Sequence, residues 1–223
     1  MTTLKHYKLW DLPVRLSHWL LVIGVVTAFV TAHYDAMDLH QYNGYMLLWV
    51  VLFRLLWGIT GSTSARFLNF LHGPGAVFAY LRGGNEHGGK RWPGHNPIGG
   101  WAVVLMLLAL LVQAITGLFS GNEDVMFDGP LVHLVSTHTV HKVSGFHGNW
   151  FYFAVLTLLV IHIGANLAYR FVKKQDLITP MITGYAPIDE ADAERLSFAP
   201  LWRAIACVGL AAVPVLGLLF QVI

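Results

Sequence analysis

The sequence predicts an all-α integral membrane protein with five transmembrane helices. Of its 223 residues, 56% are hydrophobic and 12% are charged, whereas soluble domains carry about 25% charged residues. Five apolar runs each approach the roughly 20 residues with which a helix crosses a bilayer. Helices are expected because every backbone polar group must be satisfied within the segment. The runs are Leu16–Ala32, Tyr42–Ile59, Gly99–Phe119, Trp150–Phe171 and Leu201–Ile223.

Composition also excludes several classes of protein. So much apolar surface with so little charge fits neither a water-soluble globule nor a disordered chain. The net charge of +2 is too small to indicate a nucleic-acid partner. Cys207 is the single cysteine, so the chain has no internal disulfide, no cysteine-ligated iron–sulfur cluster and no CxxCH attachment site for a covalent haem.

The basic residues predict the orientation. If the five runs are helices, 13 of the 14 lysines and arginines fall on one side of the membrane and only Lys142 falls on the other. By the positive-inside rule, the N-terminus is cytoplasmic and the C-terminus lies outside. The outer loops carry the acidic residues Asp35, Asp38, Glu123, Asp124 and Asp128.

Two segments between the runs also carry expectations. Ala76–Leu81 lies in a loop rich in glycine and proline, and its apolar side chains favour a short interfacial helix. The acidic stretch Asp189–Glu194 is expected to be a solvated loop.

Among the 12 histidines, four in or beside the runs fall at two matched depths, whereas His33, directly after the first run, is expected at the membrane interface. His18 and His162 lie toward the cytoplasmic side, and His40 and His147 lie toward the outer side. The 15 residues from His147 to His162 span about 22 Å of helix, close to four turns, so both rings face a similar direction. Two stacked haems in a helix bundle require such an arrangement, and bis-histidine ligation suits electron transfer because it leaves no open iron position.

Alternatives exist for these assignments. A single intramembrane histidine is often only a hydrogen-bonded contact between helices, although four at matched depths argue against this. His133, His138 and His141 compete with His147 as the outer ligand. His141 lies 21 residues from His162, about 31 Å along a helix, which places it at or beyond the membrane edge. We therefore favour His147.

The chain resembles bacterial cytochrome b561-type proteins, the group that includes the b-type subunits of nickel-iron hydrogenases. The resemblance extends along nearly the whole chain and is specific only when its motifs are taken together. The motifs are Trp10–Trp19, Leu39–Tyr45, Arg54–Gly58, Gly94–Pro97, Gly117–Phe119, Leu159–His162 and Met181–Gly184.

The resemblance implies a four-helix transmembrane bundle that holds two b haems, one near each membrane face. It pairs His18 with His162 and His40 with His147. Residues 1–185 would form this dihaem domain, and residues 186–223 an acidic loop followed by a fifth helix that packs outside the bundle. The family spacing on the fourth helix is usually one residue shorter, and Gly148 occupies the expected place. A π-bulge could absorb this offset of about 100°; otherwise the outer ligand differs.

Two arginines and two glycines complete the candidate cofactor-binding residues. Arg54 follows His40 by 14 residues, about 21 Å along a helix, so it could pair with a propionate of the inner haem or extend to the cytoplasmic surface. Arg15, one turn before His18, is a second candidate for a propionate. Gly44 and Gly117 could admit a haem plane or simply allow close helix packing.

Three functions are compatible with these residues. The resemblance implies a conduit between the membrane quinone pool and a periplasmic redox protein such as a c-type cytochrome, in the bacterial inner membrane. A second possibility is direct reaction with a small oxidant such as superoxide. A third is a non-haem iron or zinc enzyme, although His138-x-x-His141 is the only tight cluster and no HExxH motif accompanies it. Oligomerisation stays open.

Overall fold

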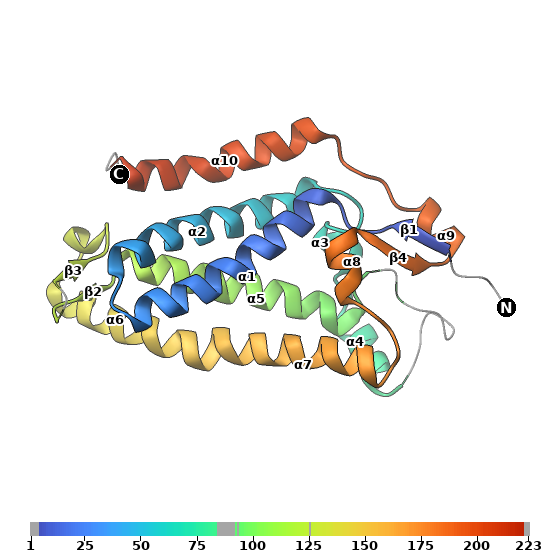
Figure 1. Cartoon of the computed structure of the whole chain (residues 1–223), viewed down its shortest axis with the longest axis horizontal. Helices are drawn as coiled ribbons and strands as arrows, with labels where there is room; N and C mark the ends of the chain where they lie inside the picture. Colours follow the sequence, from blue (N-terminus) through green and yellow to red (C-terminus); the bar gives the residue numbers. More distant parts are fainter. Residues whose placement is uncertain (1–4, 84–91, 93, 125, 221–223) are drawn as a thin grey trace. The chain divides into compact units, whose positions relative to one another are not determined.

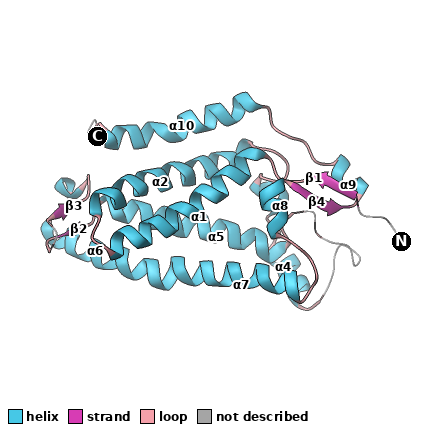
Figure 2. Cartoon of the chain, viewed as in Figure 1, coloured by secondary structure: helices cyan, strands magenta, loops and turns pink. Residues whose placement is uncertain are grey.

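A computed structural model describes residues 5–83, 92, 94–124 and 126–220, and helices dominate it (Figures 1 and 2). Five helices in these ranges are long and apolar enough to cross a membrane. The expected all-α membrane architecture is therefore confirmed. Lys90 and Arg91, which contribute to the predicted orientation, lie outside the described residues. The five helices are α1 (Leu12–His33), α2 (Met37–Thr60), α5 (Pro97–Leu118), the continuous helix Thr137–Phe171, and α10 (Leu201–Leu219).

The fourth of these helices begins 13 residues before the apolar run. It consists of α6 (Thr137–Trp150), a π-helical segment η2 (Phe151–Leu156) and α7 (Thr157–Phe171). Ser136 caps its N-terminus, where the side-chain oxygen accepts a hydrogen bond from the Thr139 backbone N–H at 3.3 Å. Hydropathy marks only the part of a helix that lipid must cover, so the polar first turns of α6 escaped prediction.

Short elements fill the connections. The short helix expected at residues 76–81 is present as α4 (Pro74–Leu81), and its place at the membrane interface stays a prediction. The acidic stretch was wrongly expected to be entirely loop, because α9 (Glu190–Glu194) forms after Asp189, whose carbonyl accepts hydrogen bonds from the N–H groups of Asp192 and Ala193. Acidic side chains favour the start of a helix. The other short elements are β1 (Lys5–Lys8), α3 (Phe67–Phe70), β2 (Gly121–Asn122), β3 (Phe127–Asp128), η1 (Val132–Leu134), α8 (Ile178–Thr183) and β4 (Tyr185–Ile188).

The chain divides into two compact units, and each is described separately. Unit 1 contains Met1–Leu16, Leu55–Leu105 and Ile161–Ala206, and unit 2 contains Ser17–Arg54, Met106–Val160 and Cys207–Ile223.

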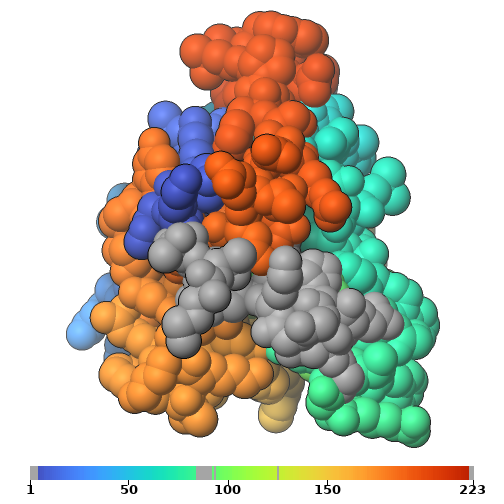
Figure 3. Space-filling model, turned by 90° about the vertical axis from the view of Figure 1, so that its right-hand side faces the viewer, coloured from blue at the N-terminus to red at the C-terminus, as the bar shows by residue number. Residues whose placement is uncertain are grey.

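In unit 1, a strand pair and the buried Asp11 hold the N-terminal end of α1 in place. Strands β1 and β4 pair antiparallel, with Tyr7 opposite Ala186, and the space-filling view shows the N-terminal segment against the orange segment that contains α8 and β4 (Figure 3). The buried carboxylate of Asp11 accepts hydrogen bonds from the Val14 N–H at 2.7 Å and from Trp57 Nε1 at 3.0 Å. This one side chain therefore caps α1 and ties it to α2.

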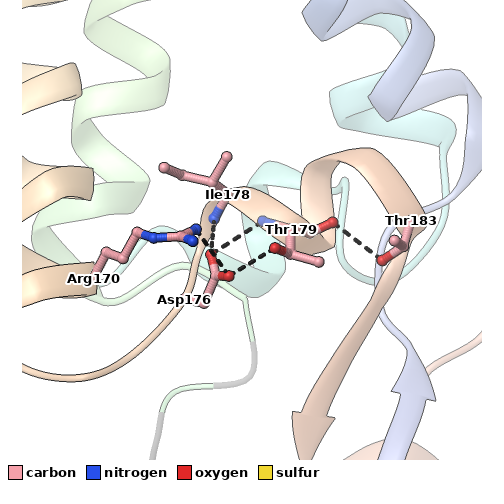
Figure 4. A network of polar contacts seen from close by, with 5 residues as sticks. All are labelled: Arg170, Asp176, Ile178, Thr179 and Thr183. Carbon is pink, nitrogen blue, oxygen red and sulfur yellow. Dashed lines mark hydrogen bonds and ion pairs between the residues drawn. The ribbon is translucent and has the colours of Figure 1, made fainter.

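Asp176 organises the start of α8 within unit 1 (Figure 4). Its Oδ1 accepts from the N–H groups of Ile178 at 2.9 Å and Thr179 at 3.1 Å. Its Oδ2 accepts from Thr179 Oγ1 at 2.7 Å and from Arg170 at 3.1 Å. The hydrogen bond from the Thr179 side chain is the main cause that lowers the pKa of the Asp176 carboxyl, with further contributions from the backbone N–H groups and Arg170.

Replacement of Asp176 with asparagine is expected to loosen α8 at neutral pH. Asparagine still offers an acceptor oxygen, but it lacks the negative charge that pairs with Arg170 and favours the start of a helix, an effect worth about 0.3–1 kcal/mol. Because the carboxyl pKa is lowered in the folded chain, its contribution is complete above the unfolded value of about 3.9 and disappears as the pH falls through the folded value. Hydrogen exchange of the α8 amides in detergent should therefore differ between wild type and Asp176→Asn at pH 7 and converge in acid. A constant difference at all pH values would contradict this role.

Unit 2 has its apolar core where α10 meets α2 and α5. Tyr45 and Leu48 of α2 are buried with Val215 and Leu218 of α10. Side chains of α5 and the following loop pack against this cluster: Leu111, Ala114, Leu118 and Leu131. Trp49 Nε1 also donates to the Val208 carbonyl of α10 at 3.1 Å. Within unit 2, the fifth helix is thus attached through both apolar packing and a hydrogen bond.

Candidate functional site

Two histidines predicted as ligands lie side by side in unit 2. His40 lies in the first turn of α2 and His147 near the end of α6, and both are half-buried. Their ring centroids are 6.2 Å apart, and the ring planes are inclined by 84°. Imidazole–metal bonds are about 2.0–2.1 Å long for zinc, so two rings on one metal ion have their coordinating nitrogens about 4 Å apart. The observed ring separation is compatible with that requirement.

The hydrogen bond of His40 defines its tautomer. Its Nδ1 lies 3.0 Å from the Ala28 carbonyl oxygen in α1. A carbonyl can only accept, so Nδ1 carries the proton and Nε2 keeps its lone pair. The Thr31 hydroxyl lies farther from the same nitrogen, at 3.4 Å, and donates to the Thr27 carbonyl at 2.7 Å. This is the arrangement in which a histidine presents Nε2 to a metal.

His147 has the same tautomer through contacts with α5. Its Nδ1 lies 3.1 Å from Thr116 Oγ1. The Thr116 hydroxyl donates to its own helix, with Val112 O at 2.8 Å and Gln113 O at 3.0 Å. The Thr116 oxygen is thereby left to accept the His147 Nδ1–H. The Gln113 side-chain nitrogen lies 3.1 Å from His147 Nε2. An amide nitrogen can only donate, so the ring nitrogen Nε2 of His147 is the acceptor. An iron atom at Nε2 would replace this amide contact, because one lone pair serves one partner.

The three rival histidines are at the surface of unit 2. His133 and His138 are exposed. His141 is 59% exposed at its side chain, and its Nε2 lies 3.3 Å from Glu123 Oε1. None of the described ring contacts brings one of these three to His40, whereas His147 contacts it directly.

The π-helical segment accounts for the spacing on the fourth helix. The six residues Phe151–Leu156 lie between His147 and His162, at the place where an extra residue had to be accommodated. Phe151 stacks on Phe29 of α1 at 5.8 Å between ring centroids. A π-bulge inserts one residue without advancing the helix by 100°, so the spacing of 15 becomes equivalent to a spacing of 14.

His18 and His162 are described in different units. In unit 2, the half-buried His18 on α1 makes an edge contact with Trp19 at 5.4 Å between centroids. In unit 1, Asn166 Nδ2 lies 3.4 Å from Nε2 of the half-buried His162 and donates to its carbonyl at 2.8 Å. The pairing of these two histidines rests on helix spacing and on the family resemblance.

The two candidate arginines are also in different units. In unit 1, Arg15 donates a hydrogen bond to the Ile182 carbonyl at the end of α8. Its Nε is buried and has no hydrogen-bond partner among the described residues. A guanidinium carries five donor hydrogens, so Arg15 has capacity for a carboxylate. Arg54 is half-buried on α2 in unit 2.

The two candidate glycines have different surroundings. A Cβ at Gly117 would come within 3.0 Å of the His147 ring carbon Cε1, so this glycine lets the His147 ring lie against α5. A Cβ at Gly44 would meet no atom within 4 Å. Close helix packing therefore does not explain the glycine at position 44. That Gly44 makes room for the plane of a haem stays a prediction.

The donor set fits axial ligation of a haem. It consists of two neutral imidazoles from different helices, each with its proton on Nδ1 and its lone pair on Nε2. On His147, a metal would take the place of the Gln113 amide at that lone pair. Among the described residues, no three or more histidines, cysteines or carboxylates gather at one point to hold a metal ion. Two axial nitrogens suffice for haem, because the porphyrin supplies the other four ligands.

Comparison with known proteins shows the family to which the chain belongs. The family model described as prokaryotic cytochrome b561 matches residues 9–184, a range that includes all four candidate ligands. This chain belongs to the prokaryotic cytochrome b561 family. It is accordingly a b-type cytochrome of the membrane with a role in electron transfer, and the family implies haem b as its cofactor.

Curated relatives of this cytochrome come from Rhizobium and Azotobacter species. A probable Ni/Fe-hydrogenase B-type cytochrome subunit of Rhizobium leguminosarum bv. viciae is 23% identical over 218 residues, covering 78% of this chain and 86% of the relative. The corresponding Azotobacter vinelandii protein is 24% identical, with 79% and 86% covered. No solved structure matches the chain significantly.

Sequence reasoning missed the groups that form hydrogen bonds with the two candidate ligands His40 and His147. Gln113 and Thr116 are polar residues within the otherwise apolar helix α5, three positions apart. Polar side chains inside a membrane span are a signal of function or of helix contact. That signal was available in the sequence, but it does not say which histidine they contact. The Ala28 carbonyl has no sequence signal at all.

Proposed function

We propose that this protein is a dihaem electron conduit that connects the membrane quinone pool with a periplasmic redox protein. The observation that carries the proposal is the juxtaposition of His40 and His147, with both Nδ1 atoms hydrogen-bonded and their rings 6.2 Å apart. These two residues would hold the outer haem. His18 and His162 would hold the inner haem, with Arg15 and Arg54 as partners for its propionates and Gly44 admitting a haem plane. Bound haem b supplies one-electron transfer at each site.

Haem content tests the proposal directly. The purified protein is expected to give two haem b per chain in a pyridine haemochrome assay. The His162→Ala protein should give one haem per chain, because the inner site loses an axial ligand while His40 and His147 are untouched. A wild-type ratio of one haem per chain would contradict the dihaem arrangement.

The quinone and the periplasmic partner need a second assay. Oxidation of one quinol releases two electrons and two protons, and two haems accept the electrons singly. We expect reduction by a quinol analogue, followed by reoxidation when a soluble c-type cytochrome is added. The acidic outer residues would speed association with a partner of basic surface, so the reoxidation rate should fall as salt increases. Reoxidation by superoxide without such a partner would support the alternative function.

The proposed orientation places the N-terminus in the cytoplasm and the C-terminus in the periplasm, across the bacterial inner membrane. It follows from the basic residues, 13 of 14 of which fall on one side of the five helices. The curated relatives are named as hydrogenase subunits, which supports assembly with a redox protein. For this chain, we propose a c-type cytochrome or another soluble periplasmic redox protein as the partner.

A further inference from the structure

We propose that Thr116 is a positioning residue for the outer haem: its hydroxyl orients His147 and increases the electron donation of that ligand to iron. The inference deepens the proposed function and depends on ligation by His147. It rests on the 3.1 Å contact between Thr116 Oγ1 and His147 Nδ1, together with the hydrogen bonds that the hydroxyl itself donates to α5.

The direction of this hydrogen bond follows from the hydrogen bonds that the Thr116 hydroxyl donates, and the orientation of the Gln113 amide agrees with it. The single hydroxyl proton of Thr116 is used by the carbonyls of Val112 or Gln113, so its oxygen accepts from Nδ1. On the opposite side of the ring, the Gln113 amide nitrogen donates to Nε2. Both contacts require the proton on Nδ1 and the lone pair on Nε2. The ring is thereby held in the tautomer and orientation that haem ligation requires.

The two outer ligands are held in unequal ways. His40 donates to a backbone carbonyl, Ala28 O, at 3.0 Å, and no side-chain substitution removes that acceptor. His147 donates to a side chain that can be replaced. The chain therefore offers one ligand whose hydrogen bond can be deleted and one whose hydrogen bond persists.

Loss of this hydrogen bond should change the haem in a predictable direction. A hydrogen bond from Nδ1–H makes an imidazole more basic and stabilises the ferric state of the iron that it ligates. Without it, the ligand donates less strongly, so the midpoint potential of the outer haem should rise. Loss of a hydrogen-bond partner of a metal ligand also weakens binding of the metal about 10- to 100-fold.

Thr31 provides a matched control on the same haem. Like Thr116, it lies in a membrane helix, donates to a carbonyl four residues earlier, at 2.7 Å, and has its Oγ1 near a ligand Nδ1. That distance is 3.4 Å, and His40 keeps the Ala28 carbonyl at 3.0 Å. Thr31→Val thus removes an equivalent intrahelical hydrogen bond without removing the principal partner of the ligand.

The experiment is a potentiometric titration of the full-length haem-loaded protein, with haem retention measured by transfer to excess apomyoglobin. The outer haem is identified as the component that is absent from His147→Ala. We expect Thr116→Val to raise its potential and to weaken retention about 10- to 100-fold. Thr116→Ser should restore both properties. Thr31→Val should have the wild-type potential and haem retention at the outer haem, and the potential of the inner haem should be the same in all of these variants. Thr116→Ala serves as the second variant without a hydroxyl if valine prevents folding.

Three outcomes would overturn the inference. These are a wild-type potential in both Thr116→Val and Thr116→Ala, equal shifts in Thr116→Val and Thr31→Val, or failure of Thr116→Ser to restore the potential. The last outcome would attribute the effect to packing of the threonine methyl group. Failure of the proposed function is distinguishable, because His147→Ala would then keep the haem content of the wild type.

Discussion

Replacement of His147 with alanine is expected to remove one haem b from the chain and to leave the other in place. His147 is half-buried against α5, and its ring lies 6.2 Å from that of His40. Without the imidazole, the chain would supply only one of the two ligands that would hold the proposed outer haem. The haemochrome assay should fall from two haems per chain to one, and His40→Ala should behave in the same way. Added imidazole should partly restore the missing haem in either protein.

His141→Ala and His138→Ala are the matched controls for this prediction. Both residues lie on the same helix as His147 but are exposed, and His141 is paired with Glu123 at 3.3 Å. Both variants should keep two haems with unchanged spectra. Loss of one haem in His141→Ala, with His147→Ala unaffected, would transfer the ligand to the surface histidine. Equal loss of both haems in His147→Ala would instead indicate that the membrane domain requires the outer haem to fold.

A one-residue insertion in the π-helical segment is expected to remove a haem, whereas a one-residue deletion there should be tolerated. Deletion of Phe153 leaves the two histidines 14 positions apart and converts the segment to a regular α-helix, so the relative directions of His147 and His162 persist. Phe153 is 80% exposed, and its loss removes little packing. An alanine inserted after Phe153 requires either a second bulge or a rotation of about 100°.

Haem stoichiometry separates these two variants. The deletion should retain two haems per chain, and the insertion should retain one. A matched pair in α10, with one residue deleted or inserted beside the exposed Val213, should keep both haems, because that helix contributes no candidate ligand. Loss of a haem from the Phe153 deletion would show that the π geometry itself is needed, beyond the register that it restores.

Much of the candidate site was accessible from the sequence, because its main signals are local. A long apolar run predicts a membrane helix whatever its neighbours are, and α1, α2, α5 and α10 begin and end within a few residues of those runs. The depth of a histidine within such a run follows from counting residues at 1.5 Å each. The excess residue between His147 and His162 predicted a π-bulge as one alternative, and η2 is found there.

The tertiary structure decided which groups these elements bring together. The polar first turns of α6 form a helix, β1 pairs with β4, and α9 forms where a loop was expected. The contacts of Thr116 with His147 and of the Ala28 carbonyl with His40 are visible only in the folded arrangement of α1, α2, α5 and α6 within unit 2. Hydropathy and spacing describe one helix at a time. A hydrogen bond between helices also depends on their rotation and on the distance between them, which are set by packing over many side chains.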